Sequence, residues 1–314
     1  MTTEVIENVR ISGQYYRLTL ACAEIANQAS AGQFVMIRVH QGLDPLLRRP
    51  FSIHRLWDSR RHRPSPDSGS DRPQGIQILF RLAGKGTAYL ASLSTGAKID
   101  VIGPLGHGFQ LEKPVLHPVL IAGGIGIAPL LFLADQLRVV SGQWPVVSKE
   151  KTGDRSQESG VRSQEKNKLQ ATSLMESPLF QPRLFLGGKS AEDILCQEDF
   201  RKQGFSLSIS TEDGSLGHKG LITEPLCAYL EQVTRISSGI EPVLFACGPL
   251  PLMSRVIEIA RHYHLSCQVS LEQRMACGVG ACMGCVVELE EGDNSHQYRR
   301  VCTEGPVFEI LIKN

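Results

Sequence analysis

The first third of the chain alternates short hydrophobic runs with clusters of turn-forming residues. Runs rich in β-branched and aromatic side chains occupy 15–20, 33–39, 75–82 and 97–102. Such runs, bounded by Gly, Pro, Asn and Asp, are typical of β-strands. We therefore predict a small antiparallel barrel from Val5 to about Leu111. The segment 58–73, DSRRHRPSPDSGSDRP, has almost no hydrophobic side chains, which predicts a solvated loop inserted into one hairpin.

The pattern changes after His117, where hydrophobic strands alternate with segments of helical periodicity. Three such pairs follow one another, at 118–124 and 128–140, 182–188 and 191–203, and 241–249 and 251–263. Strands that alternate with helices predict a doubly wound parallel sheet. Residues 141–181 are rich in Ser, Lys, Glu and Gln and contain few aromatic residues, which predicts a disordered insertion.

The last part of the chain shows a third pattern, with two alternating segments around a polar centre. VVELE and YRRV flank EGDNSHQ, and this arrangement predicts a β-hairpin. The hairpin would return Cys302 to the side of Cys285. We therefore expect three units, a barrel over 1–112, an α/β domain over 113–265 and a small C-terminal module over 266–314.

Composition narrows the classes of function. The chain has 314 residues, of which 42% are hydrophobic and 21% are charged, as in ordinary globular proteins. The formal net charge is +1, so no strong field favours nucleic acid or an anionic membrane as a partner. The longest hydrophobic run, 119–134, is interrupted by glycines and a proline and is shorter than the about 20 residues that span a bilayer. The N-terminus lacks the hydrophobic segment of a secretory signal, so we expect a cytoplasmic protein.

Four of the nine cysteines crowd into the C-terminal module with the spacing Cys277-x4-Cys282-x2-Cys285, followed by Cys302. This spacing matches plant-type ligation of a [2Fe–2S] cluster, and the glycines between the ligands let the backbone bend sharply around inorganic sulfide. A four-cysteine zinc site usually has two C-x2-C pairs, and the sequence has one. A zinc knuckle or four free thiols is the alternative. The remaining five are expected to be small buried hydrophobic residues, and they are Cys22, Cys196, Cys227, Cys247 and Cys267.

Several segments are candidates for contacts with phosphates or an aromatic cofactor. RRPFS at 48–52 offers guanidinium groups and a ring, and GKGT at 84–87 precedes a helical segment that Thr87 can cap. GPLGHGF at 103–109 is a turn-rich segment that ends the barrel. In AGGIGIAP a strand, a glycine turn and a helix follow one another, so phosphates can bind at Gly123, Gly124 and Gly126. Pro129 stands where the dinucleotide fingerprint has its third glycine, so an ordinary strand-to-helix turn is the alternative.

Taken in order, RPFS, GKGT, GPLGHGF, AGGIGIAP, TEDGS and ACGP resemble the ferredoxin reductase superfamily, in which an FAD-binding barrel precedes an NAD(P) domain. RRPFSI together with CGVGACMGC is similar to one family within it, the electron transfer subunits of class B dihydroorotate dehydrogenase. The resemblance covers nearly the whole chain. It implies FAD contacts at Arg49, Pro50, Phe51, Ser52, Leu79, Phe80, Arg81, Gly86 and Thr87, cluster ligands at Cys277, Cys282, Cys285 and Cys302, and a turn facing the nicotinamide at Cys247, Gly248 and Pro249.

Two details refine what the resemblance implies. Phe51 stands where the superfamily often has Tyr, so stacking on the flavin is kept and a hydroxyl contact is lost. Glu212 and Asp213, at the end of FSLSISTEDGS, are placed to accept hydrogen bonds from ribose hydroxyls and would repel a 2′-phosphate, which favours NAD over NADP. A simple acidic turn is the alternative. No catalytic acid or base is expected, because the cofactors carry the chemistry.

The resemblance implies an oxidoreductase subunit of pyrimidine biosynthesis. In this family dihydroorotate is oxidised in an FMN-containing TIM barrel, a fold of about 250 residues for which this chain has no room. A separate catalytic subunit, in a heterotetramer with two copies of each chain, would pass electrons through the [2Fe–2S] cluster and FAD to NAD. The main alternative is an NAD(P)H-dependent flavin and iron–sulfur reductase component for a sulfide dehydrogenase, hydrogenase or oxygenase. The non-enzymatic alternative is a zinc-stabilised nucleotide-sensing module.

Overall fold

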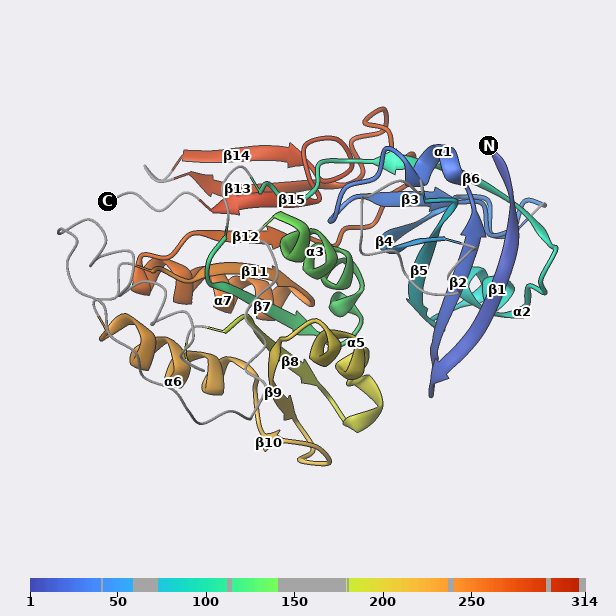
Figure 1. Cartoon of the computed structure of the whole chain (residues 1–314). Helices are drawn as coiled ribbons and strands as arrows, with labels where there is room; N and C mark the ends of the chain where they lie inside the picture. Colours follow the sequence, from blue (N-terminus) through green and yellow to red (C-terminus); the bar gives the residue numbers. More distant parts are fainter. Residues whose placement is uncertain are drawn as a thin grey trace, which may run out of the picture.

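The computed structural model describes residues 1–40, 42–58, 73–111, 115–140, 179, 181–236, 240–291 and 295–310. A barrel lies at one side of the molecule and a sheet with helices at the other, while a C-terminal hairpin runs along the upper edge of the sheet (Figure 1). Most of the insertions predicted at 58–73 and 141–181 lie outside the described residues, which omit 59–72, 141–178 and 180. Asp58, which the sequence analysis assigned to the solvated loop, directly follows β4 and is 1% exposed, so this residue is buried and not solvated.

Six antiparallel strands close the barrel in the order β1-β2-β5-β4-β3-β6. Alternation explains which side of each strand is buried: Leu18 and Leu20 point into the interior, and Ile53 faces Ile78 across two neighbouring strands. The predicted antiparallel barrel is therefore confirmed, with two strands, β1 and β4, that the sequence analysis did not name. The elements are β1 (Thr2–Ser12), β2 (Tyr15–Ala21), α1 (Ala23–Ala26), β3 (Phe34–Ile37), β4 (Arg49–Trp57), β5 (Gly75–Arg81), α2 (Lys85–Ser92) and β6 (Lys98–Leu105).

The second unit is a seven-stranded sheet in the order β10-β9-β8-β7-β11-β12-β15. Its first six strands are parallel and β15 adds an antiparallel edge, so the predicted doubly wound parallel sheet is confirmed. The strands are β7 (Pro118–Gly123), β8 (Arg183–Gly188), β9 (Ser206–Thr211), β10 (His218–Lys219), β11 (Val243–Cys247), β12 (Cys267–Ser270) and β15 (Val307–Ile310). The helices are α3 (Ile127–Val140), α5 (Gln197–Lys202), α6 (Thr223–Thr234) and α7 (Leu250–Tyr263).

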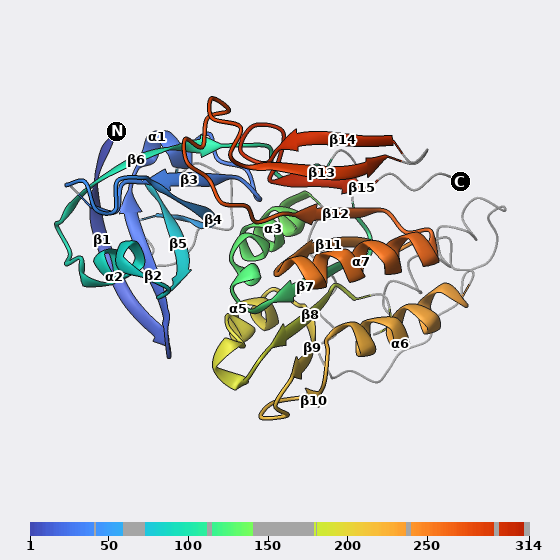
Figure 2. The same ribbon diagram turned by 180° about the vertical axis from the view of Figure 1, so that it is seen from behind.

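Helices cover both faces of this sheet, with α3 and α5 between the sheet and the barrel and α6 and α7 on the other side (Figures 1 and 2). The alternation along β7 makes both faces hydrophobic: Leu120 packs into the core that contains α3, and Ile121 packs into the core that contains α6 and α7. Helix α6, which the sequence analysis did not name, buries Leu226, Leu230 and Val233 at helical spacing.

One predicted helix is wrong. The segment 191–203 contains a short 3₁₀ turn at Ala191–Asp193 and then α5, because the chain between them is not helical. Ile194 is extended, and Cys196 adopts the left-handed conformation with φ of 59°, which ends the first turn and starts α5 from a new direction.

The cysteine-bearing segment lies between two strands of the sheet. β12 precedes it and β15 follows it. These two strands pair antiparallel, with Cys267 opposite Ile310 and Ser270 opposite Val307. Between them β13 (Val286–Glu291) and β14 (Ser295–Arg300) form the predicted hairpin, which is confirmed, with Val286 opposite Arg300. The pairing of β12 with β15 fixes both ends of the segment on the edge of the sheet.

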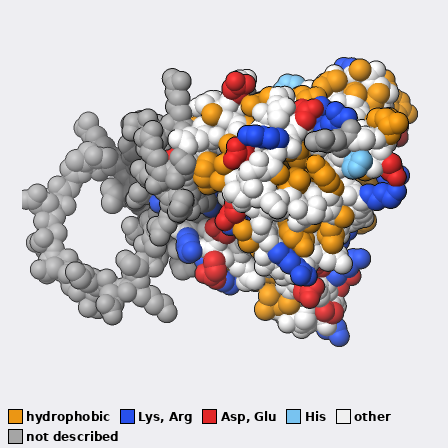
Figure 3. Space-filling view, turned by 90° about the vertical axis from the view of Figure 1, so that its right-hand side faces the viewer, with side chains coloured by type: hydrophobic (Ala, Val, Ile, Leu, Met, Phe, Trp, Pro, Cys, Tyr) orange, Lys and Arg blue, Asp and Glu red, His pale blue; other side chains and the backbone are white. Residues whose placement is uncertain are grey.

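The surface of the barrel end carries small hydrophobic patches with Lys, Arg, Asp and Glu side chains between them (Figure 3). Neither sign of charge dominates this face, which agrees with the net charge of +1. Within the described residues, no helix is long and hydrophobic enough to cross a membrane. Of the five scattered cysteines, Cys22, Cys247 and Cys267 are buried and Cys196 and Cys227 are half-buried.

Candidate functional site

The cysteine loop, residues 277–285, folds back on itself through left-handed backbone positions. Gly278 and Gly280 have φ of 74° and 83°, and Met283 has φ of 58°. The loop touches the barrel closely, since a Cβ at Gly278 would lie 2.5 Å from Met36 Cγ on β3. Glycine at 278 is therefore required both by the backbone conformation and by the approach to the barrel. Cys285 and Cys302 are each 2% exposed, whereas Cys277 is half-buried and Cys282 is exposed.

The hairpin brings Cys302 beside Cys285, as the sequence analysis expects. The Val301 N–H donates to the Cys285 carbonyl at 3.1 Å, and the Cys302 N–H donates to Cys285 Sγ at 3.4 Å. Cys285 therefore receives its partner from 17 residues further along the chain. The end of the cysteine loop and the residues that follow β14 therefore lie against each other, with the Cys302 backbone beside the Cys285 thiol.

The four thiols form two pairs. Cys277 hydrogen-bonds with Cys282, and Cys302 hydrogen-bonds with Cys285. Two thiolates per iron are what a [2Fe–2S] cluster with four cysteine ligands requires, since two sulfides bridge the irons. The described residues contain no group of three or more His, Cys, Asp or Glu side chains that could hold one metal ion. The four cysteine donors and their arrangement in two pairs fit a two-iron cluster.

Backbone N–H groups point at the sulfur atoms, as they do around iron–sulfur clusters. The N–H of Val279 donates to Cys277 Sγ at 3.4 Å, and the N–H of Gly284 donates to Cys282 Sγ at 3.5 Å. The bond from Val279 and the contact with Cys282 lower the pKa of Cys277 to about 6. Burial and the neighbouring Cys285 raise the pKa of Cys302 to about 11.

The residues expected to contact FAD lie together on one end of the barrel. Arg49, Pro50, Phe51 and Ser52 occupy the first half of β4 and are half-buried, while Leu79, Phe80 and Arg81 end the neighbouring strand β5. The rings of Phe51 and Phe80 meet edge to face with centroids 5.9 Å apart. β4 and β5 are adjacent antiparallel strands, so these two segments share one surface.

The GKGT segment lies beside Arg49. A Cβ at Gly86 would lie 2.9 Å from Val39 Cγ2 and 3.6 Å from Arg49 Cγ, so the start of α2 packs tightly against the strand that carries the arginine. Thr87 caps α2 as expected, although it does so from the third residue of the helix, while Gly84 occupies the N-cap position. Its hydroxyl accepts from the N–H groups of Ala83 and Gly84 at 2.8 and 3.1 Å and stabilises the turn that precedes the helix. The helix N-terminus and Arg49 together offer donors and positive charge to a phosphate.

The AGGIGIAP turn and the ACGP turn meet at the point where the chain changes direction in the sheet. β7 and β11 are adjacent, yet the chain runs from β7 to β8 on the other side, so a switch point lies at their carboxyl ends. In α/β sheets of this kind, ligands bind in the crevice at the switch point. A Cβ at Gly126 would lie 2.3 Å from the Cys247 carbonyl oxygen, and one at Gly123 would lie 2.8 Å from Pro249 Cδ.

Gly124 is different from its two neighbours in the turn. Its φ is 52° and a Cβ there would meet no atom within 4 Å, so its backbone faces open space at the switch point. Gly248, at the end of β11, is buried next to Gly123. The turn therefore packs closely against the end of β11 on one side and leaves the backbone of Gly124 accessible on the other.

Glu212 and Asp213 are exposed and directly follow β9. Their backbone N–H groups donate to the carbonyls of Gly188 and Lys189 at 3.0 and 3.1 Å, which fixes the turn at the end of the neighbouring strand. Asp213 Oδ1 accepts from the N–H and the hydroxyl of Ser215 at 2.9 and 2.6 Å, and these bonds lower the pKa of the carboxyl group. The carboxylate of Asp213 is thus ionised at neutral pH, and both side chains are open to solvent.

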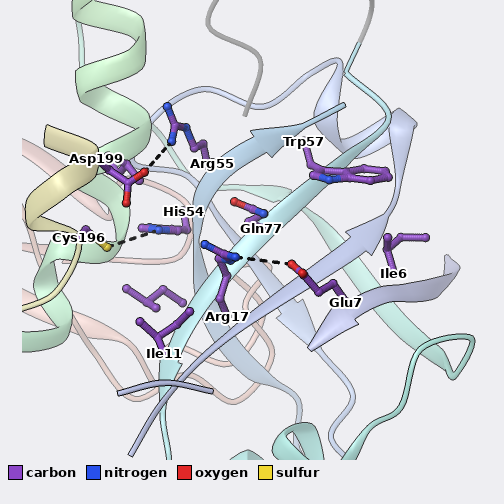
Figure 4. Close-up of a pocket in the computed structure, with 12 residues that line it drawn as sticks. Ile6, Glu7, Ile11, Arg17, His54, Arg55, Trp57, Gln77, Cys196 and Asp199 are labelled. Carbon is purple, nitrogen blue, oxygen red and sulfur yellow. Dashed lines mark hydrogen bonds and ion pairs between the residues drawn. The ribbon is translucent and has the colours of Figure 1, made fainter. Parts of the chain in front are cut away.

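A cavity of about 450 Å³ lies between the outer surface of the barrel and α3 and α5 (Figure 4). His54 Nδ1 donates to the Ala128 carbonyl at 2.7 Å, and its Nε2 lies 3.9 Å from Cys196 Sγ. Burial lowers the pKa of His54 to about 4 and raises that of Cys196 to about 12, so both groups are neutral at pH 7. This Cys–His contact is a neutral structural hydrogen bond and not an activated nucleophile.

Sequence reasoning missed Glu272, which follows β12 at the carboxyl edge of the sheet. Its carboxyl group interacts electrostatically with the Cys247 side chain at the end of β11 and with the Arg81 guanidinium at the end of β5. Glu272 therefore lies between the switch point and the barrel residues that are expected to contact FAD. Burial raises the pKa of its carboxyl group, and Arg81 opposes that rise. The signal available in the sequence was its place directly after a short hydrophobic run.

Comparisons with known proteins agree with this geometry. Residues 272–311 match the model of the iron–sulfur cluster binding domain of dihydroorotate dehydrogenase B. The electron transfer subunit of dihydroorotate dehydrogenase B (NAD(+)) from Desulforamulus reducens is 32% identical over 307 residues, which cover 97% of this chain and 94% of the relative. The subunit of the same name from Shouchella clausii is 32% identical over 308 residues, covering 98% and 95% of the two chains.

Solved structures share the fold. An NADH-dependent reduced ferredoxin-NADP oxidoreductase studied for flavin-based electron bifurcation superposes with a TM-score of 0.68 at 22% identity, over 98% of this chain and 87% of that chain. The Amycolatopsis cytochrome P450 reductase GcoB superposes with a TM-score of 0.56 at 19% identity, over 84% and 66% of the two chains. At these identities the likeness concerns the fold alone.

Proposed function

The chain belongs to the family of dihydroorotate dehydrogenase B (NAD(+)) electron transfer subunits, and on that premise we propose that it carries electrons from a catalytic subunit through a [2Fe–2S] cluster and FAD to NAD. The oxidation of dihydroorotate takes place in that FMN-containing partner, in a heterotetramer with two copies of each chain. We further propose that it works in the cytoplasm, in pyrimidine biosynthesis.

One observation carries this proposal, the contact between the cysteine loop and the barrel. Gly278 packs against Met36 on β3, and Met36 is paired with Pro50 on β4, within the Arg49–Ser52 segment. Adjacent strands lie about 4.8 Å apart, so the thiols are separated from the FAD residues by little more than one strand. A path this short suits electron transfer between two bound cofactors.

Each group of residues has a distinct task in the proposal. Cys277, Cys282, Cys285 and Cys302 hold the cluster, which supplies one-electron transfer when it is bound. On the barrel, Arg49 and the start of α2 bind the pyrophosphate of FAD, Phe51 stacks beside the ring system, and Ser52, Leu79 and Arg81 orient it. At the switch point Gly123, Gly124 and Gly126 receive the phosphates of NAD, Cys247 to Pro249 face the nicotinamide, and Glu212 and Asp213 accept from ribose hydroxyls.

The exposed edge of the cysteine loop supports docking of the catalytic subunit at this place. Cys282 is exposed, and the neighbouring Val279 and Met283 are 51% and 58% exposed. Hydrophobic side chains in water beside a ligand of the cluster are suited to a protein interface that excludes solvent from the electron path. Electrons thus enter at the loop and leave at the switch point.

The test uses the full chain, reconstituted anaerobically with iron, sulfide and FAD. We expect about two irons and two sulfides per chain, a flavin spectrum that NADH bleaches, and NAD reduction by dihydroorotate once the purified catalytic subunit is added. The matched variant Cys277→Ser should lose the iron and the coupled NAD reduction and keep FAD. Protein that binds zinc and no iron, or coupled activity that survives without the cluster, would refute the proposal.

A further inference from the structure

Arg300 ends β14 two residues before Cys302, and its side chain reaches the cysteine loop. Nη1 donates to the Gly280 carbonyl at 3.1 Å, between the ligands Cys277 and Cys282. The side chain is 38% exposed, so the guanidinium is partly shielded from water by the loop that it touches. A positive charge therefore stands beside the loop that carries Cys277 and Cys282.

Glu304 holds this arginine from the other side. Its Oε2 accepts from the Arg300 backbone N–H at 2.8 Å and from Arg300 Nε at 3.4 Å. Its Oε1 accepts from Arg299 Nη1 at 3.2 Å. Glu304 thus orients Arg300 toward Gly280. Its own side chain is 31% exposed, and its negative charge lies beside Arg300, near the end of the cysteine loop.

The two side chains make structural contacts of similar kind and carry opposite charges. An iron–sulfur cluster gains a negative charge when it is reduced, so a nearby cation favours the reduced form and a nearby anion disfavours it. Taking a cluster held by these cysteines as given by the proposed function, we propose that Arg300 raises the reduction potential of the cluster and Glu304 lowers it, so that this pair sets the potential at which electrons pass to FAD.

The size of the effect follows from the distance dependence of charge interactions. A unit charge about 10 Å away, at an effective dielectric constant of about 20, changes a one-electron equilibrium by about tenfold. For a one-electron couple a tenfold change corresponds to about 59 mV. Because both side chains are partly exposed, salt should weaken the effect.

The experiment is a redox titration of the reconstituted holoprotein, followed by the electron paramagnetic resonance signal of the reduced cluster. Arg300→Gln should lower the ratio of reduced to oxidised cluster at a fixed potential by about tenfold, and Glu304→Gln should raise it by a similar factor. Arg300→Lys should restore most of the ratio, and the remote exposed Lys202→Gln should leave it unchanged. Both shifts should shrink in about 1 M salt.

The opposite signs separate electrostatics from structure. If the two substitutions merely loosened the loop, both would move the potential in the same direction, and that result would overturn the inference. Shifts smaller than about twofold in both variants, with a full complement of iron, would overturn it as well. If Arg300→Gln does not retain iron, Glu304→Gln still tests the sign, because a lower or unchanged ratio in that variant would overturn the inference. Wild-type protein without a cluster would refute the proposed function instead.

Discussion

Arg55→Met removes a deeply buried charge pair between the barrel and the α/β domain. Arg55 lies on β4, and its Nε and Nη2 each donate to Asp135 on α3 at 2.7 Å, with the two side chains 11% and 9% exposed. Nη1 also lies 3.3 Å from Asp199 Oδ1 on α5, and Gln203 Nε2 donates to Asp135 at 3.0 Å. The pair therefore joins the barrel to the α/β domain at the cavity.

The magnitude follows from what the substitution leaves behind. Without Arg55 the carboxylate of Asp135 stays buried with Gln203 as its remaining donor, and breaking a buried pair in this way costs about 3–5 kcal/mol of unfolding free energy. Replacing both partners, in Arg55→Met with Asp135→Leu, should recover most of that loss, because no unpaired buried charge remains. The exposed ion pair of Arg201 with Glu198 gives the matched control, since Arg201→Met should cost less than about 0.5 kcal/mol.

The loss should also depend on pH. Burial raises the pKa of Asp135 to about 6 while Arg55 opposes the rise, so in the variant the pKa is higher still. The folded variant then binds a proton that the unfolded chain has released above about pH 4, and its stability increases as the pH falls. Urea unfolding at pH 8 and pH 5 measures both effects. A loss below about 1 kcal/mol at pH 8, or a loss equal at the two values, would refute the reasoning.

Three further outcomes are expected. Gly126→Ala forces a Cβ to 2.3 Å from the Cys247 carbonyl oxygen. The affinity for NAD, measured by titration, should therefore fall at least about tenfold, with the FAD content unchanged. An unaltered affinity would contradict the proposed NAD site at the switch point. Cys277→Ser should abolish iron binding and spare FAD, whereas Cys196→Ser should change neither, and equal damage in metal analysis would undo the distinction between the two cysteines. Burial lowers the pKa of His54 to about 4, so its contribution to stability is present above about pH 6.5 and is lost as the pH falls toward 4. His54→Gln should reduce this loss of stability, measured as the dependence of the thermal unfolding temperature on pH. An unchanged pH dependence in the variant would contradict the role of His54.

The sequence by itself determined the features that depend on local spacing. Alternation at every second residue predicted barrel strands such as β2 and β5, and the strand–helix alternation after His117 predicted the parallel sheet. The Cys277-x4-Cys282-x2-Cys285 spacing and the hairpin predicted where Cys302 would return, because a hairpin brings together residues whose separation is fixed by its length. Local conformation was still misjudged at Cys196, where helical periodicity gave no sign of a left-handed residue.

Only the tertiary structure decided which distant surfaces meet. The contact of Gly278 with Met36 joins residues that no pattern relates, and it places the cysteine loop one strand away from Arg49–Ser52. Arg55 and Asp135 are 80 residues apart, and their pairing depends on how α3 packs on β4. Periodicity reports which face of an element is buried, but it does not report the partner that covers that face. The partner is selected by the packing of the whole chain, so the path between the cofactor sites could be read from the fold and not from the sequence.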